Sequence, residues 1–209
     1  MNASQILLRE EFSAVLDDLS ARAKHSKNSK LNLIIFRLAA CCGLRRGEMC
    51  GLNMSDFTLN TPKPVIHIRK ENTKGRDGKR RARFVPLDWD TGSLKDLTAW
   101  HALRVSQGAG PLDPFVATAS GKRLEESLAF RRWRTAIRVL GPERVKQVSI
   151  HDGRHTFCSH ALHGGKTLVQ VRDAAGHSSV NTTNIYLHIL DQSADGKLFD
   201  FSDLKTINF

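Results

Sequence analysis

The chain has 209 residues, enough for one hydrophobic core, and its 40% hydrophobic and 25% charged residues are ordinary for a globular protein. Its charge balance is unusual, because 32 basic residues against 21 acidic ones leave a net charge of +11. Such an excess favours a polyanionic partner. The sequence has no apolar run of roughly 20 residues that could cross a membrane, and its amino terminus lacks a secretory signal, so we expect a cytoplasmic protein that does not bind membranes.

The hydrophobic pattern predicts a mainly helical chain with a small sheet. Apolar residues recur at helical spacing over 7–20. The segment 31–42, LNLIIFRLAACC, is apolar nearly all round, which predicts a central buried helix that ends at Gly43. PVIHI and RFVPL flank a turn-rich segment with Asp77-Gly78 at its tip, which predicts a β-hairpin. Further helices are expected over 93–106, 124–139, 151–163 and 166–175.

The predicted hairpin concentrates positive charge. Residues 69–83, RKENTKGRDGKRRAR, hold eight basic and two acidic residues, a local excess of six within the net charge of +11. A local excess of this kind is typical of a face that binds nucleic acid. The candidate DNA-binding side chains are Arg69, Lys70, Arg76, Lys79, Arg80, Arg81 and Arg83.

Two segments offer side chains that suit a phosphate group. In HDGRH, His151 and Arg154 are three residues apart, so a helix would place them on one face, near an amino terminus that also favours anions. In GLRRGEMCGL, Arg45 and Arg46 follow the predicted buried helix, and Glu48 can orient a guanidinium for bidentate recognition. Taken alone, each segment also fits an ordinary helix or surface ion pair of a basic protein.

A zinc site is a competing interpretation of the histidines. His151 and His155 have the spacing of a metalloprotease helix, and His160 and His163 follow. That motif requires a glutamate directly after the first histidine, where this chain has Asp152. The cysteines also lack metal-ligand spacing and are expected to be buried apolar residues: Cys41, Cys42, Cys50 and Cys158. We therefore expect no metal, and the absence of a glycine-rich phosphate loop predicts no nucleotide cofactor.

The chain contains one tyrosine, Tyr186, in NTTNIYLHI, although it has ten phenylalanines and three tryptophans. It comes nine residues after His177, which lies in AAGHSS. With these residues the sequence resembles the tyrosine recombinase, or phage integrase, family. The match runs through GLRRGEMCGL, the basic hairpin ending in FVPL, HDGRH and GHSSVNTTNIYLHI, and covers most of residues 7–190.

The resemblance implies the catalytic fold of that family, mainly α with a small antiparallel β-sheet (α+β). It assigns catalytic roles to Arg45, Lys74, His151, Arg154, His177 and Tyr186, with Glu48 supporting them. Tyr186 would attack a DNA phosphate, forming a 3′-phosphotyrosine and releasing a 5′ hydroxyl without metal or cofactor. Arg45 and Arg154 would hold the non-bridging oxygens. His151 would manage protons near the nucleophile, and His177 would add a hydrogen bond to the phosphate.

The resemblance also implies a hairpin lysine that protonates the departing 5′ oxygen, but the position of this lysine is open. Lys74 is our choice, but the hairpin is longer than usual for the family, which leaves Lys79 and Lys70 as alternatives. Gly153 and Ala175 stand where the family often has leucine, and we interpret both as packing changes beside the site.

The resemblance also implies a homotetramer on double-stranded DNA at the nucleoid, and a monomer or weak oligomer without DNA. We expect residues 1–209 to form a single catalytic domain without the family's amino-terminal DNA-clamping domain. Its core would be 7–190, and the tail, 191–209, would be exchanged between protomers or fold back on its own domain. Two alternatives stay open: a type IB topoisomerase, which relaxes DNA as a monomer, and a non-catalytic DNA-binding regulator.

Overall fold

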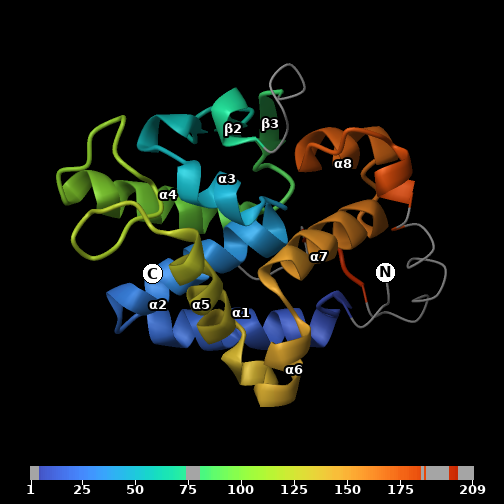
Figure 1. Cartoon of the computed structure of the whole chain (residues 1–209), viewed down its shortest axis with the longest axis horizontal. Coiled ribbons are helices and arrows are strands. Elements are labelled where there is room, and N and C mark those ends of the chain that lie inside the picture. Colours follow the sequence, from blue (N-terminus) through green and yellow to red (C-terminus); the bar gives the residue numbers. More distant parts are fainter. Residues whose placement is uncertain (1–4, 74–80, 185, 187–197, 202–209) are drawn as a thin grey trace.

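The computed structural model describes residues 5–73, 81–184, 186 and 198–201. It confirms a mainly helical protein with a small antiparallel sheet (Figure 1). The α-helices are α1 (Arg9–Ala23), α2 (Lys27–Phe36), α3 (Arg46–Gly51), α4 (Thr91–Ser106), α5 (Glu126–Ala136), α6 (Pro142–Gln147), α7 (Ile150–His163) and α8 (Leu168–Ala175). The strands are β1 (Phe57–Thr58), β2 (Val65–Ile68) and β3 (Arg83–Pro86). Short 3₁₀ turns are η3 (Met54–Asp56), η4 (Lys70–Asn72) and η5 (Arg138–Leu140).

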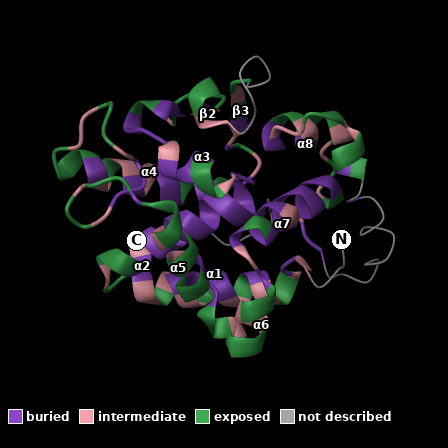
Figure 2. Ribbon diagram, viewed as in Figure 1, coloured by how far each residue is buried: buried purple, intermediate pink, exposed green. Residues whose placement is uncertain are grey.

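The centre of the molecule is the apolar helix expected from the sequence. Helix α2 continues into a π-helical turn, η2 (Arg37–Cys41), and every residue of 31–44 is buried (Figure 2). Gly43 follows with a φ of +65°, so the helix ends at the predicted residue. Because α1, α5 and α7 pack around this segment, its side chains meet protein on all sides. All four cysteines are buried and unpaired, as predicted.

The hairpin is also confirmed. β2 pairs with β3 in antiparallel register, with Ile66 opposite Val85 and His67 opposite Phe84. The predicted tip at Asp77-Gly78 lies outside the described residues. The sequence analysis missed β1, which adds a third strand beside β2, and it missed α3 and α6, because elements this short show no clear periodicity.

Helix α7 links the core to the sheet. It crosses η2 and packs against α8, and α8 packs against β3. The sheet and α8 lie on one side of the molecule, and α1 and α6 lie on the opposite side (Figure 1). The start of α3 and the end of α8 meet at β3, where Arg83 bonds Glu48 and the carbonyl of Ala174, although the three elements are far apart in the sequence. Among the described helices, none is both long enough and apolar enough to span a bilayer.

The described part of the tail lies on the protein's own core. Leu198, Phe199 and Phe201 are each 2–3% exposed. The Phe199 amide donates a hydrogen bond to Nδ1 of His160 (3.3 Å), and the rings of these two residues are 4.0 Å apart. Phe12 of α1 packs edge-on against Phe199. These contacts are those of a tail that folds back within one chain, and exchange between protomers stays a prediction.

Candidate active site

Arg154 lies at the centre of the candidate site, on α7. Ser149 caps this helix, since its hydroxyl accepts from the Asp152 amide and the Asp152 carboxylate accepts from the Ser149 amide. The Arg154 side chain is 1% exposed and its Nη1 donates to the carbonyl of Gly43 (2.8 Å). Within the described part of the structure its Nη2 has no hydrogen-bond partner. Burial lowers the pKa of Arg154 to about 10, so the site holds a desolvated cation that an anion would stabilise.

Glu48 links two further arginines to the site. Its carboxylate, 1% exposed, accepts two hydrogen bonds of 2.8 Å from the Arg83 guanidinium, and one of 2.8 Å from Nη1 of Arg45. Burial alone would raise the pKa of Glu48, but the hydrogen bonds and charges of Arg83 and Arg45 outweigh it and lower the pKa below its ordinary value. Glu48 is therefore ionised and fixes the Arg45 guanidinium, as its proposed supporting role requires.

The turn after α8 brings His177 to these arginines. Gly176 has a φ of +69°, and a Cβ at this residue would lie 2.8 Å from Cδ of Arg83, so only glycine fits. Its carbonyl accepts from Nη2 of Arg45 (3.1 Å), and the carbonyl of Ala174 accepts from Nε of Arg83 (2.9 Å). The two arginines thus tie the end of α8 to Glu48 and set the position of the residue that follows, His177.

Tyr186 is 2% exposed and packs between two histidines. Its hydroxyl is 2.7 Å from Nδ1 of His155, and its ring is parallel to that of His177 within 5°, with centroids 6.2 Å apart. Nδ1 of His177 in turn bonds the Thr183 hydroxyl at 3.0 Å. Burial and the neighbouring thiol of Cys158 raise the pKa of Tyr186 above its ordinary value. The phenol is therefore neutral in this structure.

The pKa values of His177 and His155 are both lowered by burial and by nearby positive groups of the candidate site. Burial, followed by the charges of Arg154 and Arg45, lowers the pKa of His177 to about 3. Burial and the neighbouring His151 lower the pKa of His155 to about 4. His151 itself is exposed at the start of α7, with its ring edge-on to that of His155 at 4.7 Å. The structure thus brings together five of the six residues assigned by resemblance: Arg45, His151, Arg154, His177 and Tyr186.

The family profile described as "Phage integrase family" matches residues 7–193. The chain belongs to the phage integrase family. Tyrosine recombinase XerC of Rhodospirillum centenum is 33% identical over 156 residues, which are 74% of this chain and 41% of that protein. A tyrosine recombinase of Pseudothermotoga lettingae is 30% identical over 167 residues, 80% of this chain and 52% of that protein. The chain therefore spans about half the length of these curated relatives.

Solved structures of family members show the same fold. The crystal structure of XerA recombinase superposes with a TM-score of 0.69 at 24% identity, over 90% of this chain and 62% of that one. The XerH site-specific recombinase bound to palindromic difH substrate, a post-cleavage complex, gives 0.66 at 24% identity, over 93% of this chain and 52% of that one. These similarities place the mainly helical core and its small sheet within the fold of this integrase family.

The hairpin candidates separate into two groups in this integrase fold. Arg69 and Arg83, both predicted to contact DNA, are bound to the protein: Arg69 pairs with Asp56 (3.0 Å) and Arg83 pairs with Glu48 (2.8 Å). Lys70 and Arg81 are exposed. The remaining hairpin cations, which include the preferred leaving-group lysine, lie outside the described residues: Lys74, Arg76, Lys79 and Arg80. The DNA contacts of the hairpin stay a prediction, whereas the pairing of Arg83 with Glu48 is a feature that the sequence analysis missed.

His155 is the second feature that it missed. The sequence analysis weighed His155 only as a zinc ligand. A sequence signal existed, because His155 directly follows Arg154 and is four residues, one helical turn, after His151. Spacing alone cannot show that its ring reaches Tyr186, 31 residues away. Within the described ranges, no three His, Cys, Asp or Glu side chains are grouped to hold a metal ion.

Gly153 shows how this chain fills the space beside the site. A Cβ at Gly153 would lie 2.8 Å from the Trp133 ring. That indole is fully buried and donates to the carbonyl of Val148 (3.0 Å). The tryptophan therefore occupies the space that a larger residue at 153 would need, in agreement with the interpretation of Gly153 as a packing change.

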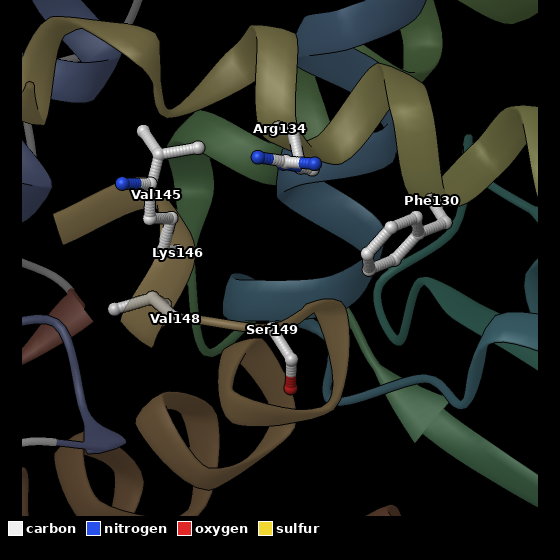
Figure 3. Close-up of a pocket in the computed structure, with 6 residues that line it drawn as sticks. All are labelled: Phe130, Arg134, Val145, Lys146, Val148 and Ser149. Atoms are coloured by element: carbon white, nitrogen blue, oxygen red, sulfur yellow. The ribbon is translucent and has the colours of Figure 1, made fainter. Parts of the chain in front are cut away.

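A separate pocket of about 230 Å³ opens at the start of α7, between α5 and α6. Figure 3 shows its lining side chains, which are Phe130, Arg134, Val145, Lys146, Val148 and Ser149. None of the assigned catalytic residues lines it. Arg134 and Lys146 are both exposed, so they add positive charge near the helix end that carries His151.

Proposed function

We propose that this chain is the catalytic domain of a site-specific DNA recombinase, which cuts and rejoins strands through a covalent bond to Tyr186. The observation that carries the proposal is Arg154. Among the described residues this buried guanidinium has a single hydrogen bond and no paired carboxylate. Such a cation is costly unless an anion completes it, and it lies in one site with the chain's only tyrosine. A DNA phosphate is the anion that accounts for both features.

Each group then has a role in the reaction. Arg154 and Arg45 bind the non-bridging oxygens, because planar guanidinium groups suit bidentate contacts with phosphate. His177 is neutral, and in the tautomer whose Nδ1 accepts from the Thr183 hydroxyl its Nε2–H donates to the phosphate. The departing 5′ oxygen takes its proton from a hairpin lysine, with Lys74 preferred over Lys79 and Lys70.

The chemistry conserves the energy of the phosphodiester. Attack by the phenol exchanges one ester bond for another, so the 3′-phosphotyrosine retains the energy needed to rejoin a second DNA end. Fixed positive charges around the phosphate stabilise the charge that develops in the transition state. These groups come from the protein, and the reaction needs no nucleotide cofactor.

The partner proposed for the site is double-stranded DNA. The net charge of +11 and the basic hairpin support it, and a solved relative, XerH, is described as bound to its difH substrate. We further propose that residues 1–209 act as one domain in a homotetramer assembled on DNA in the cytoplasm, at the nucleoid. In that assembly the tail beyond residue 191 would exchange between protomers.

Trapping of a covalent complex tests this function. The protein is incubated with nicked duplexes made from the DNA that flanks its gene, and denaturant-resistant adducts are scored. The wild type should form an adduct, and Tyr186→Phe should bind the same DNA and form none. Adduct formation by Tyr186→Phe at the wild-type rate would remove Tyr186 from its role, and specific binding without any wild-type adduct would favour a non-catalytic regulator. Strand exchange between two duplexes distinguishes a recombinase from a topoisomerase.

A further inference from the structure

The hydroxyl of Tyr186 is already hydrogen-bonded to a base inside the protein. Nδ1 of His155 lies 2.7 Å from the phenolic oxygen. Both groups are neutral, and in the His155 tautomer that carries its proton on Nε2 the phenolic O–H donates to Nδ1. This geometry fits a base that removes the phenolic proton, since such a group must lie within about 2.6–3.2 Å of that proton's oxygen.

His155 also connects the buried phenol to solvent. It is half-buried, and one helical turn earlier the exposed His151 presents its ring edge-on at 4.7 Å. Arg154, the proposed phosphate ligand, directly precedes His155 in α7. The helix therefore places the phosphate site next to the residue that holds the phenolic hydroxyl. Tyr186, His155 and His151 form a row that runs from the interior to the surface.

We propose that His155 is the base that takes the proton from Tyr186 during strand cleavage, and that His151 relays this proton to solvent. The inference rests on the proposed function and adds a residue to which the resemblance gave no role. As the bond from Oη to phosphorus forms, the bond from phosphorus to the 5′ oxygen breaks. The phenolic proton moves to Nδ1 of His155, and the 5′ oxygen takes a different proton from the hairpin lysine. Rejoining reverses both transfers.

The charges around His155 make its basicity respond to the substrate. Burial and the neighbouring His151 keep its pKa at about 4, so it is in the base form at neutral pH. A DNA phosphate on Arg154 would oppose the positive charge next to His155 and favour proton uptake only when substrate is present. The ionisable groups of the described residues that act on the His155–Tyr186 pair include Arg45, His151, Asp152, Arg154, Cys158 and His177.

The first test needs no DNA. Because Tyr186 is the only tyrosine, labelling tyrosine with ¹³C at Cζ gives one NMR signal that reports the hydroxyl. His155→Ala should shift this signal and its titration midpoint. His163→Ala, which alters an exposed histidine on the same helix, should change neither. An unchanged signal in folded His155→Ala would overturn the inference, whether or not the protein cleaves DNA.

The second test separates a base from a group that only holds the phenol in place. Single-turnover cleavage is measured on nicked duplexes that carry sulfur in place of the bridging 5′ oxygen, because a thiolate leaves without being protonated. His155→Ala and His155→Asn should remain at least about 100-fold slower than wild type at neutral pH, and a variant of the leaving-group lysine should recover. Asparagine retains an acceptor near the place of Nδ1 but cannot take up the proton.

The pH dependence completes this test. The rates of both His155 variants should rise with pH, since hydroxide replaces the missing base, whereas the wild-type rate should be flat above pH 6. His155→Asn with the wild-type rate and profile would overturn the role as a base, and so would recovery of His155→Ala on the sulfur substrate. Absence of any wild-type cleavage would instead count against the proposed function, and the NMR test would still decide whether His155 binds Tyr186.

Discussion

Among the residues that the structure describes, the two most deeply buried arginines are Arg37 and Arg154, and the fold surrounds them in opposite ways. Arg37, in η2, is 0% exposed and is held by Asp96 (2.8 Å) and Asp90 (3.3 Å). Arg154, in α7, is 1% exposed and binds a single backbone carbonyl, that of Gly43. Neither Nη2 has a hydrogen-bond partner in the part of the chain that the structure describes, so the difference lies in the carboxylates.

The two pKa values move in opposite directions for this reason. Burial alone would lower the pKa of Arg37, but neighbouring carboxylates, Asp90 foremost, raise it above its ordinary value. Burial lowers the pKa of Arg154, and the charge of Arg45 adds to the effect. A buried cation with its own carboxylates serves the fold, whereas one without them is poised for an anion from outside. The comparison predicts that stability and cleavage depend on different arginines.

The largest expected effect is the loss of cleavage on changing Arg154. Arg154→Gln should lower single-turnover cleavage by about 10⁴-fold, as for other arginines that stabilise a transferring phosphoryl group. Its unfolding free energy should stay the same or rise, because the variant removes a poorly paired buried charge. Arg138→Gln, at an exposed arginine of η5, is the matched control. If Arg154→Gln lowered cleavage only tenfold or less, the proposal that Arg154 serves cleavage and Arg37 serves stability would be wrong.

Arg37→Met should show the opposite pattern. It leaves Asp90 and Asp96 buried without their cation, so urea denaturation should show a loss of about 3–5 kcal/mol, while cleavage per folded molecule stays near the wild-type value. Arg37→Met combined with Asp96→Leu should recover part of the loss, since it removes one of the two carboxylates that Arg37→Met leaves unpaired, while Asp90 remains. No recovery in the double variant would show that packing, and not charge pairing, sets the role of Arg37.

Glu48 lies between these two extremes, because its carboxylate fixes cations that also face the site. Glu48→Gln should cost about 2–3 kcal/mol of stability at neutral pH. The pKa of Glu48 is lower in the folded protein than the unfolded value of about 4.3. The wild-type advantage should therefore be complete above pH 5 and disappear as the pH falls through the folded pKa. Denaturation curves of both proteins between pH 3 and 7 measure it, and a difference that does not change with pH would contradict the pairing.

The exposed hairpin cations should give the smallest effect. Replacing Lys70 and Arg81 by alanine should reduce the slope of log affinity against log salt by about 0.9 for each lost phosphate contact, and should weaken binding to all DNA sequences alike. Replacing Lys24 and Lys27, exposed at the end of α1 and the start of α2, removes equal charge on the side opposite the sheet. Equal slopes in the two double variants would show that the hairpin does not face DNA.

The sequence alone determined the elements that depend on local pattern. The segment 31–42, apolar nearly all round, predicted a buried helix, and the alternation in PVIHI and RFVPL predicted the hairpin. The family resemblance of the motifs also predicted a site that contains Arg154, His177 and Tyr186. The two-residue strand β1 and the six-residue helices α3 and α6 were beyond this reach, since each contains less than two periods of its pattern.

Only the tertiary structure decided which side chains meet. Arg154 reaches the carbonyl of Gly43 across 111 positions, Arg83 reaches Glu48 across 35, and His155 reaches Tyr186 across 31. Periodicity carries information over one element, whereas these pairs depend on how α7, α8 and β3 pack around η2. Burial also sets the chemistry of Arg154. In solvent its guanidinium would have an ordinary pKa, whereas in the packed core it is desolvated and would be stabilised by an anion.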